Sequence, residues 1–306
     1  MRRVTALILA TLAATALVGG CATVDEWQRK TIFSPVKGDQ RWHREPLAGT
    51  EVFDLPVAEG QSIRAWYTSA ERADAPTVLY LHGARWNLNG SVFRIERWVE
   101  MGYNVLAIDY RGFGASSELV PSEDSARADT RVAFEELMRR EPDPARRVVY
   151  GHSLGGALAL DLAAGNRPDE GIAAVVVEST FTSIPEVAKG LRWGWVPGLD
   201  LAITQRFDSL AKVGRVEEPL LILHGTADGV VPHEMADALY AAAAAQPKRV
   251  VKLEGASHSG ASRHPGYPVA VREFLATLPA PPTQRLAAST GALGATASGA
   301  GTTTLP

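Results

Sequence analysis

The sequence predicts an α/β protein with a mostly parallel central sheet and helices on both faces. Between residues 50 and 279, short runs rich in Val, Ile and Leu alternate with longer segments of helical periodicity. This alternation is typical of parallel strands joined by crossover helices. Some runs are apolar almost throughout, such as Thr-Val-Leu-Tyr-Leu at 77–81, as expected of strands buried on both faces. Because ligands of such sheets bind beyond the carboxyl ends of the strands, the residues that follow each run are candidates for a site.

The expected elements follow one another along this region. The first two strands flank a turn at Glu59 and Gly60 and are expected to pair antiparallel. A long helix begins at Ser122, a favourable N-cap residue, and places Ala133 and Leu137 on one face. The strands are expected at 52–57, 62–68, 77–81, 104–108, 147–150, 172–177, 220–223 and 249–253, and the other helices at 91–100, 154–164, 233–245 and 268–278.

Two segments interrupt or follow this alternation. Residues 181–218 form an insertion between two core strands and are expected to fold as a small helical cap over the site. Its Trp193 and Trp195 either bury the cap against the body or form an apolar wall for an acyl chain. Residues 280–306 are rich in Thr, Gly, Ala and Ser without periodicity. A segment of this composition buries too little apolar surface to offset its ordering entropy, so we expect a disordered tail.

The beginning of the chain has the layout of a secretory signal peptide, expected at residues 1–20. Two arginines precede an apolar run that is too short to span a bilayer comfortably, since a spanning helix needs about 20 apolar residues. Val-Gly-Gly-Cys at 18–21 resembles a bacterial lipobox, which implies a lipid-modified Cys21, the single cysteine of the chain. By the same resemblance, Ala22 favours the outer membrane, facing the periplasm. Residues 21–49 would then be a tether; the alternative is an ordinary signal peptide with an accidental cysteine.

The most informative stretch is Val-Val-Tyr-Gly-His-Ser-Leu-Gly-Gly-Ala at 148–157. A strand followed by Gly-x-Ser-x-Gly and a helix of small residues is the signature of a nucleophile elbow. Ser153 must sit on a strained strand-to-helix turn so that its hydroxyl projects from the end of the sheet. Gly151 and Gly155 are expected there because a Cβ at either position would collide with neighbouring backbone.

Five further motifs accompany the elbow in an order that resembles α/β-hydrolases. The branch that the chain resembles most holds bacterial serine aminopeptidase-like hydrolases and monoacylglycerol lipases. The resemblance spans about 50–278 and implies the α/β-hydrolase fold with a small helical cap. The motifs are Leu-His-Gly at 81–83, Asp-Tyr-Arg-Gly-Phe-Gly at 109–114, Glu-Ser-Thr-Phe at 178–181, Gly-Thr-Ala-Asp at 225–228 and Gly-Ala-Ser-His at 255–258.

A serine hydroxyl is a poor nucleophile at neutral pH, so Ser153 requires a base and an acid that orients the base. The family order of nucleophile, acid and base points to Asp228 and then His258. Asp228 follows a buried strand, and His258 lies in a loop of small residues that leaves room for an imidazole. Glu178, at the end of another strand, is the alternative acid. We expect His152, the second residue of the elbow, to face away from the site.

The negative oxygen that develops during acyl transfer requires backbone N–H donors. Leu154, directly after the nucleophile, is expected to supply one. The resemblance implies that Ala84, directly after His-Gly at 82–83, supplies the other. The bulky Arg85 and Trp86 that follow are candidate substrate contacts, which either narrow the site or bind an anionic end of the substrate; they could equally form a solvated rim.

The composition narrows the function further. A net charge of −3 leaves no basic surplus for nucleic acid. We find no metal-ligand spacing, phosphate loop or dinucleotide fingerprint, so we expect no metal and no cofactor. The sequence predicts a serine hydrolase that cleaves a carboxylic ester through an acyl-enzyme. A peptidase, amidase or thioesterase on the same triad, or a non-catalytic lipoprotein that binds a ligand, are the alternatives.

Overall fold

The computed structural model describes residues 22–35, 42–58, 60–167, 169–190 and 195–278. The predicted signal peptide, Cys21, Trp193 and the predicted tail therefore lie outside the described residues.

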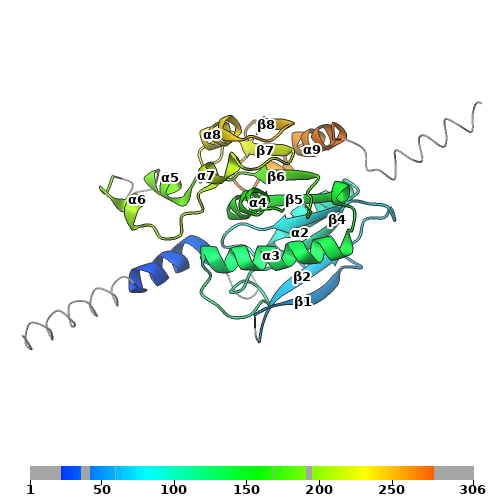
Figure 1. The fold of residues 1–306 in the computed structure, drawn as a ribbon, viewed down its shortest axis with the longest axis horizontal. Coiled ribbons are helices and arrows are strands. Elements are labelled where there is room, and N and C mark those ends of the chain that lie inside the picture. Colours follow the sequence, from blue (N-terminus) through cyan, green and yellow to red (C-terminus); the bar gives the residue numbers. More distant parts are fainter. Residues whose placement is uncertain (1–21, 36–41, 59, 168, 191–194, 279–306) are drawn as a thin grey trace, which may run out of the picture.

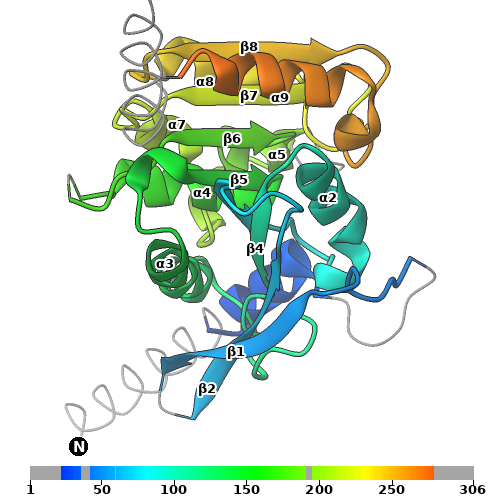
Figure 2. The same ribbon diagram turned by 90° about the vertical axis from the view of Figure 1, so that its right-hand side faces the viewer.

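An eight-stranded sheet forms the centre of the described chain, with the strand order β1-β2-β4-β3-β5-β6-β7-β8 (Figures 1 and 2). β2 pairs antiparallel with both β1 and β4, and the remaining pairs are parallel. This confirms the predicted antiparallel start and mostly parallel sheet. The strands are β1 (Glu51–Ala58), β2 (Gln61–Thr68), β3 (Thr77–Leu81), β4 (Asn104–Ile108), β5 (Arg147–His152), β6 (Ala174–Glu178), β7 (Leu220–Gly225) and β8 (Lys248–Leu253).

Helices cover both faces of the sheet and bury the two sides of each central strand. In β3, Leu79 and Leu81 join one hydrophobic core and Val78 and Tyr80 join the other, because successive side chains of a strand point to opposite faces. α3, α4 and α8 contribute to the first core, and α2 and α9 to the second. These helices are α2 (Leu88–Glu100), α3 (Glu123–Arg140), α4 (Leu154–Ala164), α8 (Glu234–Ala242) and α9 (Gly266–Ala276).

Two helices begin earlier than predicted. α2 begins at Leu88 rather than at residue 91, because the side chain of Asn87 accepts a hydrogen bond from the Gly90 N–H and caps the helix. α9 begins at Gly266, two residues before Pro268. The prediction for α3 is confirmed at its beginning, where Ser122 is the N-cap of a capping box.

The segment between β6 and β7 contains three short helices among its described residues. They are α5 (Ile184–Lys189), α6 (Leu199–Ala202) and α7 (Ser209–Val213). Ile203 and Val213 are buried, whereas Trp195 and Leu201 are 75% and 84% exposed. The short helices therefore pack through part of their apolar side chains and leave others at the surface.

A further helix, residues 22–33, precedes β1 (Figure 1). Its last residue contacts the loops that follow β3 and β4. We call it the N-terminal helix. Its last residue, Phe33, is fully buried in the first core. Of the helices that can be described, none combines the length and the apolar character needed to cross a membrane.

Candidate active site

Ser153 occupies a tight turn between β5 and α4. Its backbone dihedrals are φ 53° and ψ −117°, a conformation that residues other than glycine rarely adopt. A Cβ at Gly151 would collide with the backbone of Gly155, and a Cβ at Gly155 would collide with the carbonyl of Leu81. The close approach of β5, α4 and β3 therefore requires both glycines, as the sequence predicted.

Ser153, His258 and Asp228 lie in one hydrogen-bonded chain. Ser153 Oγ lies 3.1 Å from His258 Nε2, and His258 Nδ1 lies 2.8 Å from Asp228 Oδ2. The three residues follow β5, β8 and β7, whose carboxyl ends meet at the same edge of the sheet. The structure thus brings together the three residues that the sequence proposed as nucleophile, base and acid.

The carboxylate of Asp228 is fully buried and hydrogen-bonded on both oxygens. Oδ1 accepts from the N–H groups of Val230 and Val231, each at 2.9 Å. Oδ2 lies 2.8 Å from His258 Nδ1 and 3.2 Å from His224 Nε2. Burial opposes ionisation, but the hydrogen bonds from His224, His258 and Val231 outweigh it and hold the pKa of Asp228 well below its usual value. The ionised carboxylate can only accept, so it fixes the His258 proton on Nδ1 and leaves Nε2 as an acceptor that faces Ser153 Oγ.

His152 lies beside His258, contrary to the expectation that it faces away. Its Nε2 lies 3.1 Å from the carbonyl oxygen of His258, and the two rings are 5.1 Å apart. Burial, together with the positive charge of Arg94 and the proximity of His258, lowers the pKa of His152 well below its usual value. A neutral His152 therefore donates a hydrogen bond that holds the backbone of the residue expected to act as base.

Two backbone N–H groups beside the serine have no acceptor among the residues that the structure describes. They belong to Leu154, the first residue of α4, and to Ala84 in the loop after β3. The N–H groups of Ser153 and Arg85 are occupied, since Ser153 donates to the carbonyl of Glu178 and Arg85 donates to the carbonyl of Phe33, each at 2.8 Å. Leu154 and Ala84 are the residues proposed from the sequence as the donors of the oxyanion hole, and the positive end of α4 adds to the field beside Leu154.

The side chain of Glu178, the alternative acid, forms its hydrogen bonds and ion pair with residues other than His258. Its buried side chain is 3.2 Å from Arg94, accepts from the hydroxyl of Tyr150, and accepts from the N–H of Ser262 at 3.3 Å. None of its hydrogen bonds goes to His258 among the described residues. Glu178 therefore links β6 to the loop after His258, and its carbonyl holds the N–H of Ser153.

The predicted substrate contacts lie in different surroundings. Arg85 is exposed and adopts φ 70°, and Trp86 is half-buried with its ring stacked on Trp42 at 5.2 Å and 5°. Trp195 is at the surface, as described above. Arg85 and Trp86 directly follow Ala84, so they border the proposed oxyanion hole.

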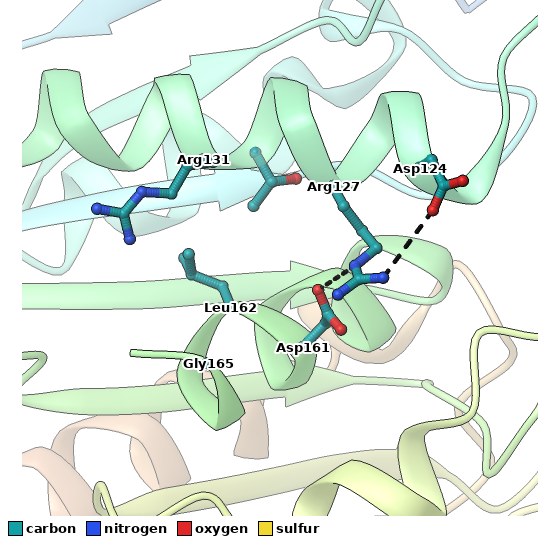
Figure 3. Close-up of a pocket in the computed structure, with 7 residues that line it drawn as sticks. Asp124, Arg127, Arg131, Asp161, Leu162 and Gly165 are labelled. Carbon is teal, nitrogen blue, oxygen red and sulfur yellow. Dashed lines mark hydrogen bonds and ion pairs between the residues drawn. The ribbon is translucent and has the colours of Figure 1, made fainter. Parts of the chain in front are cut away.

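A separate polar cavity of about 300 Å³ lies between α3 and α4 (Figure 3). Its lining contains none of Ser153, Asp228 and His258. Arg127 in this cavity forms an ion pair with Asp161 at 2.6 Å, and the charges largely neutralise each other. No group of three His, Cys, Asp or Glu side chains in the described part of the chain could hold a metal ion.

The fold and these residues define an α/β-hydrolase. Residues 73–205 match the family "Serine aminopeptidase, S33", and the chain belongs to this family. The uncharacterized protein MT2364 of Mycobacterium tuberculosis is 32% identical over 90% of this chain and 96% of its own length. The lysophosphatidylserine lipase ABHD12 of Danio rerio is 34% identical over 66% of this chain and 55% of its own length.

Solved structures share the same architecture at low sequence identity. The esterase Pf2001 of Pyrococcus furiosus superposes with a TM-score of 0.62 at 19% identity, over 80% of this chain and 98% of that one. Est1E of Butyrivibrio proteoclasticus gives a TM-score of 0.58 at 19% identity, over 74% of this chain and 98% of that one. These likenesses show that the chain has the α/β-hydrolase fold.

Proposed function

We propose that this protein is a serine hydrolase that cleaves carboxylic esters through an acyl-enzyme. The observation that carries the proposal is the hydrogen-bonded chain from Ser153 through His258 to the buried carboxylate of Asp228. A serine, an imidazole and a carboxylate that are aligned in this way allow the imidazole to move a proton between the serine and a substrate.

In the proposed reaction, His258 Nε2 takes the proton of Ser153 as Oγ attacks the ester carbonyl carbon. The carbonyl oxygen becomes an oxyanion that accepts hydrogen bonds from the N–H groups of Ala84 and Leu154. When the tetrahedral intermediate collapses, the bond to the alkoxy oxygen breaks and His258 gives its proton to the leaving alcohol. Water, deprotonated by His258, then attacks the acyl-serine and releases the carboxylic acid.

An ester is the substrate class that the comparisons favour. The structural neighbour Pf2001 is named as an esterase, and one relative is named as a lipase. The family description, serine aminopeptidase, favours an amide as the second candidate. The same triad would serve both, and also a thioester, so the discrimination depends on the leaving group that the site accommodates.

Steady-state hydrolysis of p-nitrophenyl esters of increasing chain length tests the proposal, with aminoacyl p-nitroanilides and acyl thioesters assayed in parallel. We expect turnover of the esters, and a loss of at least about 10⁴-fold in Ser153→Ala with an unchanged circular dichroism spectrum. Turnover confined to the anilides would establish the peptidase instead. Absence of turnover in all three assays would favour the non-catalytic binding protein.

We further propose that Cys21 is acylated and anchors the protein to the outer membrane, facing the periplasm. The lipobox-like sequence at 18–21 and the single cysteine support this proposal. Each buried methylene of an acyl chain contributes about 0.8 kcal/mol of membrane affinity. The test is Cys21→Ser, which should abolish labelling by radioactive palmitate and release the protein from membranes separated on a density gradient. Unchanged membrane partitioning would contradict the anchor.

A further inference from the structure

The N-terminal helix ends against the loop that carries Ala84. The carbonyl oxygen of Phe33 accepts a hydrogen bond of 2.8 Å from the N–H of Arg85. The ring of Phe33 is fully buried. It lies edge-on to two aromatic rings, with centroid separations of 6.4 Å to Phe113 and 5.7 Å to Phe207. The position of the carbonyl is thus fixed by the packing of the side chain of the same residue.

This contact fixes the backbone one residue after the proposed oxyanion-hole donor. Arg85 adopts φ 70°, a left-handed conformation that is unfavourable for a residue with a Cβ and must be held by its surroundings. The turn that Arg85 makes sets the direction of the peptide before it. Without an acceptor for the Arg85 N–H, this turn could relax and the Ala84 N–H could rotate away from the substrate oxygen.

Residues 42–44, after the N-terminal helix, contact the end of the same loop and the first turn of α2. The ring of Trp42 stacks on Trp86 at 5.2 Å and 5°. The N–H of Arg44 donates to the carbonyl of Asn89 at 3.1 Å, and the side-chain amide of Asn89 donates to the carbonyl of Arg44 at 3.0 Å. A Cβ at Gly90 would collide with the Trp42 ring, so this position must be glycine for the stack to form.

The N-terminal helix is itself secured to the body at several points. The side-chain amide of Gln28 donates to the carbonyl of Ala202 at 2.8 Å and accepts from the N–H of Thr204 at 2.9 Å. Arg29 donates to the carbonyl of Pro121 at 2.9 Å. These hydrogen bonds fix the helix against the body of the protein. They therefore also fix the position of Phe33 beside the loop.

We propose that the N-terminal region, residues 22–35 and 42–44, is part of the active site. Phe33 and Trp42 are positioning residues that hold residues 84–90, the loop after β3 and the first turn of α2, in the shape that presents the Ala84 N–H. This inference rests on the proposed serine hydrolase function. It assigns to residues 22–35 and 42–44 a role in oxyanion stabilisation in addition to tethering. It also places the elements that shape the oxyanion hole directly after the proposed anchor at Cys21.

The test compares Phe33→Ala with Phe134→Ala in the full chain. Phe134 is a matched control because it is a fully buried phenylalanine of the same core, located in α3, and its ring forms no aromatic pair with Trp86, the aromatic residue of the segment 84–90. Both substitutions should lower the thermal unfolding temperature. Only Phe33→Ala should lower kcat per titrated active site, by about tenfold or more, with KM for p-nitrophenyl butyrate nearly unchanged, because an oxyanion donor acts in the transition state.

A second readout separates positioning from a general loss of folded protein. A trifluoromethyl ketone forms a bond from Ser153 Oγ to its carbonyl carbon, which leaves an oxyanion on the ketone oxygen and a proton on His258. Its inhibition constant should rise with Phe33→Ala in proportion to the fall in kcat, and stay unchanged with Phe134→Ala. Trp42→Ala should act in the same direction, and Trp42→Phe, which can still stack, should restore the affinity.

Phe33→Leu keeps most of the apolar volume and serves if Phe33→Ala does not fold. We expect it to lower kcat and ketone affinity together by a smaller factor. Equal kcat and equal ketone affinity in wild type, Phe33→Leu and Trp42→Ala would overturn the inference while leaving the hydrolase proposal intact. An inactive wild type with no ketone inhibition would overturn both.

Discussion

The carboxylate of Asp228 offers the sharpest test of the proposed chemistry. In Asp228→Asn the side chain keeps its shape but loses the charge that faces the imidazolium of His258 during proton transfer. At the observed separation of 2.8 Å and an effective dielectric constant of about 20, two unit charges attract by about 6 kcal/mol. The asparagine also removes the preference for a proton on Nδ1. A loss of about 10⁴-fold in kcat, equivalent to about 5 kcal/mol of barrier, is therefore expected.

The assay is steady-state hydrolysis of p-nitrophenyl butyrate with the folded fraction measured by circular dichroism. Asp237→Asn is the matched control, because Asp237 is an exposed acid in α8 that pairs with Lys252 at 2.8 Å and lies outside the proposed site. We expect it to retain wild-type activity. If Asp228→Asn kept kcat within tenfold of wild type, a different group would have to orient His258, and Glu178 would be the first candidate.

Three more predictions follow from the same geometry. Gly155→Ala should destabilise the protein by about 3 kcal/mol in urea unfolding, because its Cβ would collide with a carbonyl of β3. Gly165→Ala, at the C-cap of the same helix, meets only ordinary contacts and should cost under about 1 kcal/mol; equal costs would contradict the collision. His152→Ala removes the hydrogen bond to the His258 carbonyl and should lower kcat about fivefold, and an unchanged kcat would exclude this role. The pKa of Asp228 is lowered in the folded state, so its contribution to stability is fully present above about pH 4 and is lost progressively as the pH falls below that value. The thermal unfolding temperature of wild type should therefore fall more steeply on acidification than that of Asp228→Asn. Parallel plots of unfolding temperature against pH for the two proteins would contradict this linkage.

Much of the fold could be predicted because the local signals are strong. The apolar runs of β3, β4 and β7 begin or end within a residue or two of the expected positions, since burial on both faces leaves no room for polar side chains. The elbow could also be predicted from the sequence, because its geometry restricts which residues fit. Gly151 and Gly155 are needed by close backbone approaches that any chain making this turn must satisfy.

The expected site residues could be chosen from the sequence because each lies in the turn or loop that follows a predicted strand. Ser153, Asp228 and His258 follow β5, β7 and β8, and a parallel sheet brings these ends together whatever the intervening segments do. His224 carries a similar signal, since it lies at the end of β7 four residues before Asp228. Its contact with that carboxylate could have been anticipated.

The supporting contacts could not be predicted in the same way. The hydrogen bond from Arg85 to Phe33 joins residues 52 positions apart through packing in the core, and the stack of Trp42 on Trp86 depends on a glycine at position 90. Neither has a local pattern in the sequence. The elbow fixes only the backbone of His152. The direction of its side chain depends on the loop that carries His258, and the position in the elbow therefore did not predict it.

The central claim is that Ser153 is a nucleophile activated by its contact with His258, and covalent labelling tests it most directly. Wild-type protein incubated with a fluorophosphonate should gain the mass of one phosphonyl group, and peptide mapping should place that group on Ser153. Ser153→Ala should gain no mass. An unlabelled wild type, or an adduct on a different residue that persists in Ser153→Ala, would contradict the account.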